Sequence, residues 1–76
     1  MTKNATSILK WCGACNPDAK SVFHRETMGK AIGLPYLDRR EAEDELFKAG
    51  LLNVQGKDYV ALTDKGLVEA KSLAEK

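Results

Sequence analysis

Apolar side chains near the start of the chain recur three and four residues apart, which is the spacing of one helical face. Between Asn4 and Cys15 they are Ala5, Ile8, Leu9, Cys12 and Cys15. The pattern predicts a first helix over this range. We expect Asn16-Pro17-Asp18 to end it, because proline lacks an amide proton and restricts the residue before it.

A second, short helix is predicted from His24 to Ile32, where Met28 and Ile32 lie four residues apart. The preceding Ser21-Val22-Phe23 segment is expected to be extended or a turn. Gly33 should end the helix, since glycine most readily adopts the left-handed conformation found at helix C-termini. His24 is expected to cap this helix or to face solvent.

A third helix is predicted from about Arg39 to Ala49. Asp38 can cap its first turn while Glu41 returns a hydrogen bond, the arrangement called a capping box. Gly50 is placed to end the helix. The buried stripe of this helix is expected to be Ala42, Leu46 and Ala49.

The pattern then changes to two short runs of β-prone residues, Leu51 to Val54 and Tyr59 to Leu62, around a polar turn that contains Gly56. Such runs predict a β-hairpin. Thr63 or Asp64 should cap a final helix with apolar residues at Leu67, Ala70 and Ala74. The predicted fold class is α+β, mostly α, in a single domain covering residues 1–76.

Length and charge exclude several classes of protein. A chain of 76 residues has room for one small core and little volume for a deep substrate pocket. The formal net charge of +1 excludes a polycation that coats nucleic acid without selectivity. No apolar run approaches the roughly 18 residues of a membrane span. No signal-peptide stretch is evident, so we expect a cytoplasmic protein without a membrane partner.

Two stretches resemble the winged helix-turn-helix domain of prokaryotic transcriptional regulators. Met28-Gly29-x-x-Ile32-Gly33-Leu34 is similar to the helix-turn-helix core, with a small residue where two helices approach and a glycine at the turn. Leu46-Phe47-Lys48-Ala49-Gly50-Leu51-Leu52, followed by Leu62-Thr63-Asp64-Lys65-Gly66-Leu67, resembles the end of a recognition helix, a wing and the next helix. The resemblance covers about His24 to Glu75 and implies a three-helix core with a C-terminal β-hairpin wing and a final helix.

This resemblance implies a small DNA-binding transcriptional regulator that acts as a homodimer on double-stranded DNA, without a cofactor. The first residues of a recognition helix meet base edges in the major groove, and arginine can pair bidentately with guanine. The expected contacts are Tyr36, Arg39 and Arg40 at the third helix, Gln55 and Lys57 at the wing, and Thr27, Lys30 and Arg25 on the second helix. No catalytic arrangement accompanies the single histidine, so no enzyme is expected.

The third helix departs from the family pattern. Residues 38–49 hold five acidic and three basic side chains, a net charge of −2 that opposes DNA binding. Arg39 and Glu43 also project inward at helical spacing from Leu46, so either the helix is rotated or these charges lie at a shallow edge. The same fold serves as a protein-docking module, and an acidic helix 39–49 binding a basic partner is an open alternative.

Trp11-Cys12-Gly13-Ala14-Cys15 resembles the active-site stretch of thioredoxin-like oxidoreductases, in which an exposed thiolate attacks a disulfide. A thiol redox switch or oxidoreductase is therefore a second alternative. Helical spacing instead allows Cys12 and Cys15 to face the core together. They are weak candidates for metal ligands, since structural zinc needs four, and no metal site is predicted.

Overall fold

The computed structural model describes residues 1–75, which form four helices and a three-stranded antiparallel sheet. The fold is therefore α+β and mostly helical, as predicted. None of these helices has the length and apolar character needed to cross a membrane. The elements in chain order are α1 (Lys3–Ala14), β1 (Phe23–His24), α2 (Arg25–Ile32), α3 (Tyr36–Lys48), β2 (Leu52–Gln55), β3 (Tyr59–Leu62) and α4 (Asp64–Ala74).

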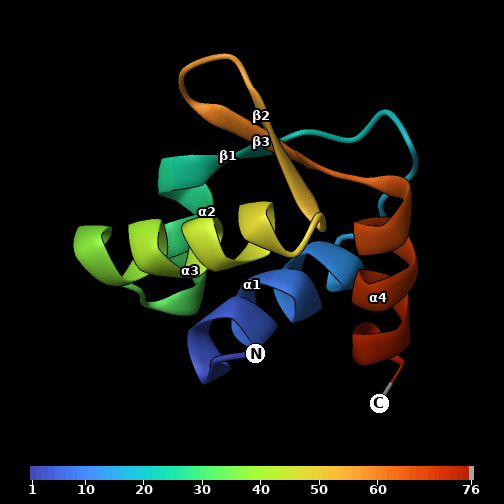
Figure 1. The fold of residues 1–76 in the computed structure, drawn as a ribbon, viewed down its shortest axis with the longest axis horizontal. Coiled ribbons are helices and arrows are strands. Elements are labelled where there is room, and N and C mark those ends of the chain that lie inside the picture. The colour runs from blue at the N-terminus through green and yellow to red at the C-terminus, as the bar shows by residue number, and fades with distance from the viewer. Residues whose placement is uncertain (76) are drawn as a thin grey trace.

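The predicted hairpin is present, and it gains a third strand from the segment before α2. The strand order is β1-β3-β2, so β3 is central. Val60 of β3 lies opposite Val54 on one side and Phe23 on the other. Gly56 in the β2–β3 turn has a φ of 74°, which glycine adopts without strain. Figure 1 shows the hairpin rising at one side of the helices.

Helix α1 lies at the centre of the hydrophobic core and packs against α2, α3 and α4 (Figure 1). Its apolar stripe is fully buried from Ala5 to Cys12, as the spacing predicted. Trp11 is half-buried and its ring meets that of Phe23 edge to face, with centroids 5.8 Å apart. The other fully buried apolar side chains are Met28, Leu46, Val60 and Ala70.

Two glycines let backbones touch inside this core. A Cβ atom on Gly13 of α1 would overlap the carbonyl oxygen of Ala70 in α4. A Cβ atom on Gly66 of α4 would overlap the carbonyl oxygen of Leu51, just before β2. Both neighbours are backbone atoms, which cannot turn aside as a side chain can. Helix α4 is therefore fixed closely against both α1 and the base of the hairpin.

Substituting Gly13→Ala should lower the free energy of unfolding by about 2 kcal/mol, because the added methyl group forces α1 and α4 apart. In an unobstructed helix the same change would raise stability by up to about 1 kcal/mol. The midpoint of urea unfolding measures the effect. Lys10→Ala, at an exposed position of the same helix, is the matched control. A Gly13→Ala variant as stable as the parent would contradict the close approach.

The predicted glycines that follow α2 and α3 and the predicted caps of α2 and α4 are confirmed. Gly33 and Gly50 have φ values of 73° and 76°, and the residue after each donates its N–H to a carbonyl five residues earlier. His24 caps α2, since its Nδ1 accepts a hydrogen bond from the Thr27 N–H at 3.3 Å. Thr63 caps α4 in the same way, with Oγ1 3.0 Å from the Gly66 nitrogen.

The start of α3 was predicted wrongly. The helix begins at Tyr36, and Pro35 is its N-cap without a side-chain hydrogen bond. Asp38 lies in the first turn and does not cap it. Proline already has the φ that leads into a helix, so the chain enters α3 without a capping box. Ala49 is exposed rather than buried, because α3 ends at Lys48.

Candidate nucleic-acid interface

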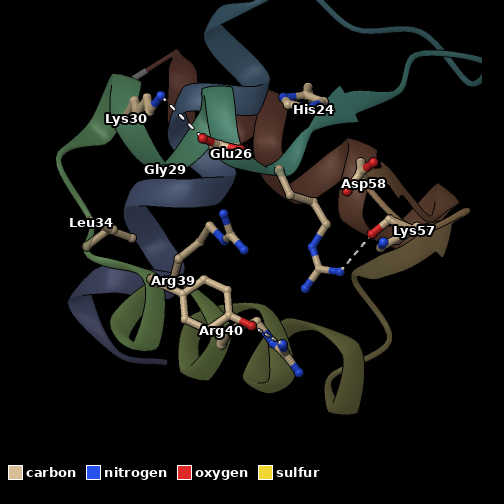
Figure 2. A pocket seen from close by; sticks show the side chains of 11 residues that line it. His24, Glu26, Gly29, Lys30, Leu34, Arg39, Arg40, Lys57 and Asp58 are labelled. Carbon is tan, nitrogen blue, oxygen red and sulfur yellow. Dashed lines mark hydrogen bonds and ion pairs between the residues drawn. The ribbon is translucent and has the colours of Figure 1, made fainter.

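A hollow of about 740 Å³ lies between α2, the start of α3 and the β2–β3 turn (Figure 2). Segments far apart in the sequence bring five cationic side chains to its walls, together with the acids Glu26 and Asp58. The cations are Arg25, Lys30, Arg39, Arg40 and Lys57. Tyr36 also lines it. The structure thus gathers most of the residues that the sequence singled out for DNA contact at one place.

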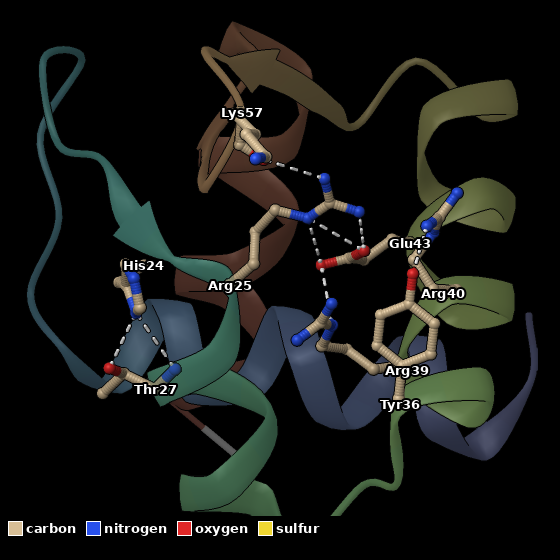
Figure 3. A network of polar contacts seen from close by, with 8 residues as sticks. All are labelled: His24, Arg25, Thr27, Tyr36, Arg39, Arg40, Glu43 and Lys57. Atoms are coloured by element: carbon tan, nitrogen blue, oxygen red, sulfur yellow. Dashed lines mark hydrogen bonds and ion pairs between the residues drawn. The ribbon is translucent and has the colours of Figure 1, made fainter.

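Glu43 of α3 lies fully buried beside the hollow and pairs with Arg25 of α2 (Figure 3). Arg25 Nη2 is 2.6 Å from Glu43 Oε1, and Arg25 Nε donates to both carboxylate oxygens at 3.2 Å. These hydrogen bonds raise the pKa of Arg25. Arg25 Nη1 also donates to the Lys57 carbonyl oxygen at 3.4 Å. One side chain therefore ties α2 to α3 and to the β2–β3 turn.

Arg39 projects inward, and only 11% of its side chain is exposed. Its Nε lies 3.6 Å from Glu43 Oε2, which is an ion pair but too long for a hydrogen bond, and this nitrogen has no hydrogen-bond partner. The helix is not rotated and these charges do not lie at a shallow edge. They form a buried group with Arg25, so Arg39 lines the inner wall of the hollow.

Tyr36 and Arg40 form the outer rim of the hollow. Tyr36 is 59% exposed, and its hydroxyl oxygen accepts a hydrogen bond of 2.7 Å from Arg40 Nη1. The Arg40 guanidinium carbon lies 5.7 Å from the centre of the Tyr36 ring, and that of Arg39 lies 5.1 Å from it. Leu37, which the sequence did not point to as a DNA contact, is 71% exposed in the same first turn.

The acidic side chains of α3 do not line this hollow. At 100° per residue, Asp38, Glu41 and Glu45 point about 120° or more away from the line between Tyr36 and Arg40, whereas the exposed Asp44 lies about 60° from it. Glu45 also accepts a hydrogen bond of 2.9 Å from the Thr2 backbone N–H. Hydrogen bonding to Thr2 lowers the pKa of Glu45. The net charge of −2 in this segment is therefore not the charge of the face that lines the hollow.

Of the remaining predicted contacts, Lys30 and Lys57 line the hollow, and Thr27 and Gln55 lie outside it. Lys30 is exposed and pairs with Glu26 at 3.3 Å, one turn earlier on α2. Lys57 is exposed in the β2–β3 turn. Thr27 is exposed with Oγ1 2.9 Å from His24 Nδ1, and Gln55 is exposed at the end of β2. Thr27 and Gln55 do not line the hollow.

The two cysteines differ in environment. Cys12 is fully buried, and burial raises the pKa of its thiol from 9.0 to about 12. Cys15 is exposed, contrary to the expectation that both face the core, because α1 ends at Ala14. In the described residues the first strand follows α1, and no three metal-ligating side chains cluster. A buried thiol near the end of a helix does not favour the oxidoreductase alternative.

The difference in burial predicts that the two thiols differ in reactivity, which a colorimetric thiol reagent measures. In the folded chain only one thiol, that of Cys15, should react readily, whereas both thiols should react in urea. Stability should also fall between about pH 9 and pH 12, because the unfolded chain releases the Cys12 proton there while the folded chain retains it. Cys12→Ala should show a shallower decline over the same range. Two equally reactive thiols in the folded protein would contradict the burial of Cys12.

Comparison of the chain with protein-family models, curated proteins and solved structures finds no match.

Proposed function

We propose that the protein is a winged-helix transcriptional regulator that binds duplex DNA through the face formed by α2, the start of α3 and the β2–β3 turn. The observation that carries the proposal is the hollow at which five cationic side chains from three separate segments meet. The element order and the strand order β1-β3-β2 support the winged arrangement. The placement of Asp38, Glu41 and Glu45 supports it further, because these three acids of α3 point away from that face.

In this proposal α3 enters the major groove. Its 13 residues make a rod of about 20 Å, and a groove about 12 Å wide admits such a helix. Arg40 and Tyr36 lie in its first turns, where they meet base edges, and the unbonded N–H groups of that end attract phosphate. Lys57 and Gln55 of the hairpin, with Lys30 and Thr27 of α2, contact the DNA backbone.

We further propose that two copies bind together as a homodimer. A two-fold dimer of such domains reads half-sites about 34 Å apart, or multiples of that distance. At saturation the stoichiometry should then be two chains per duplex site. Sedimentation of the complex with a labelled duplex measures it.

Titrating a fluorescent duplex with the protein at several salt concentrations, from about 50 to about 200 mM, tests the function. With about four phosphate contacts, log K should fall against log salt with a slope of about −3.6. Lys57→Ala should make the slope shallower by about one unit. Lys71→Ala on α4, exposed and away from the hollow, should leave the slope unchanged. No detectable binding at the lowest salt would overturn the proposal.

A further inference from the structure

We infer that the hollow is a binding site for one phosphate group, with Arg39 as its principal ligand. The phosphate belongs either to the DNA backbone or to a free phosphorylated small molecule, because the chemistry of recognition is the same. The DNA source rests on the proposed function, whereas the site itself does not. Arg39 then contributes to affinity and reads no base, although the sequence placed it with Arg40 in the major groove.

The first argument is that Arg39 is largely buried while its hydrogen-bond donors lack partners. Only 11% of the side chain is exposed, yet it makes no hydrogen bond among the described residues, and its Nε is fully enclosed. A guanidinium carries five N–H donors. Buried polar groups are nearly always hydrogen-bonded, and the ion pair with Glu43 at 3.6 Å satisfies none of the N–H donors of Arg39. The two terminal nitrogens of Arg39, Nη1 and Nη2, therefore have donors free for an anion that enters the hollow.

The second argument is that Glu43 cannot neutralise both arginines beside it. Its carboxylate accepts all three of its hydrogen bonds from Arg25. Arg39 stays at 3.6 Å. Two guanidinium groups beside one carboxylate leave one positive charge over. Around the hollow as a whole, five cations face the acids Glu26, Asp58 and Glu43, which leaves a net charge of +2.

The third argument is that the surroundings fix the position of Arg39. Gly29 of α2 passes close to its stem: a Cβ atom there would lie 3.0 Å from Arg39 Cδ. On the other side the Tyr36 ring lies 5.1 Å from the guanidinium carbon. An arginine held in one orientation presents its planar fork ready for use. Such a fork matches the oxygens of phosphate, which several donors can bind at once.

The wild-type protein tests the site without any substitution. The Nε–H signals of the arginine side chains are followed by 15N-edited NMR while sodium phosphate is added, with sodium chloride at matched ionic strength as the control. We expect the Arg39 signal to shift with phosphate until it saturates and to stay unmoved in chloride. An Arg39 signal that responds equally to both salts overturns the inference.

Two variants separate charge from geometry. Arg39→Lys keeps the charge without the fork and should bind inorganic phosphate about tenfold more weakly, as expected for one lost charge-assisted hydrogen bond. In the wild-type protein phosphate should also shift the backbone amide signal of Tyr36 until it saturates, and Arg39→Met should abolish this shift. Phosphate binding that persists unchanged in both variants would overturn the role of Arg39. Retained amide-signal dispersion verifies that each variant is folded.

Duplex DNA identifies the source of the phosphate. If it is the backbone, Arg39→Met should weaken binding to two unrelated sequences by the same factor and make the salt slope shallower by about one unit. A loss that depends on the base sequence would overturn the inference. Saturable phosphate binding without DNA binding would remove the proposed function and leave the site, with a small molecule as its ligand. DNA binding with an unmoved Arg39 signal would instead leave the proposed function standing and overturn the phosphate site at Arg39.

Discussion

Replacing Glu43 with alanine is expected to lower the free energy of unfolding by about 3–5 kcal/mol, the loss typical of a broken buried ion pair. Glu43 is fully buried, and Arg25 and Arg39 expose only 16% and 11% of their side chains. Without the carboxylate, two guanidinium groups remain together with no negative charge between α2 and α3. For a domain of this size, such a loss is a large part of the total stability.

Urea unfolding followed by the fluorescence of Trp11 measures this loss. Glu41→Ala, at an exposed position of the same helix, should change stability by no more than about 0.5 kcal/mol. The double variant Arg25→Ala with Glu43→Ala should lose less than the sum of the single variants, because one substitution relieves the charge that the other leaves. If Glu43→Ala matched Glu41→Ala, the buried pair would not hold α2 and α3 together.

Replacing Arg40 with alanine is expected to weaken DNA binding by about 1–3 kcal/mol, which is roughly 5- to 150-fold. Arg40 is exposed in an early turn of α3, and its hydrogen bond to the Tyr36 hydroxyl directs it along the rim of the hollow. If it reads guanine, the loss is confined to duplexes that carry the preferred base. Fluorescence anisotropy with matched duplexes measures it.

Two controls define this result. Tyr36→Phe keeps the ring and removes the hydroxyl, so it should weaken binding less than Arg40→Ala does. Lys71→Ala removes an equal charge from α4, which does not line the hollow, and should leave affinity unchanged. Equal losses for Arg40→Ala on every sequence would show that Arg40 contacts phosphate rather than a base.

Local sequence signals predicted the helices, the hairpin and most helix ends. Glycine adopts positive φ values that other residues rarely adopt, so Gly33 and Gly50 could be identified as helix ends without tertiary information. The regular spacing of apolar residues likewise identified the buried face of α1, because a helix repeats every 3.6 residues. These features depend on neighbours in the chain, which the sequence displays directly.

The wrong predictions of burial arose where the spacing of a helical face was extended to residues beyond the end of the helix. Ala49 and Cys15 fit the apolar spacing of α3 and α1, but each lies one residue beyond the end of its helix and is exposed. The candidate site has a different difficulty. Arg25 and Glu43 are 18 residues apart, and only the packing of α2 on α3 shows that the inward-facing acid has a partner. Helical spacing showed that Glu43 points inward, but it did not show which residue pairs with it.

The most direct test of the proposed DNA-binding face is a map of backbone amide shifts on adding a short duplex. The account predicts that the largest changes fall in Tyr36–Arg40 and Gln55–Asp58, with smaller changes around Thr27 and Lys30. Residues of α4 should stay unmoved. Changes concentrated on α4 and the exposed face of α1, or none at low salt, would contradict it.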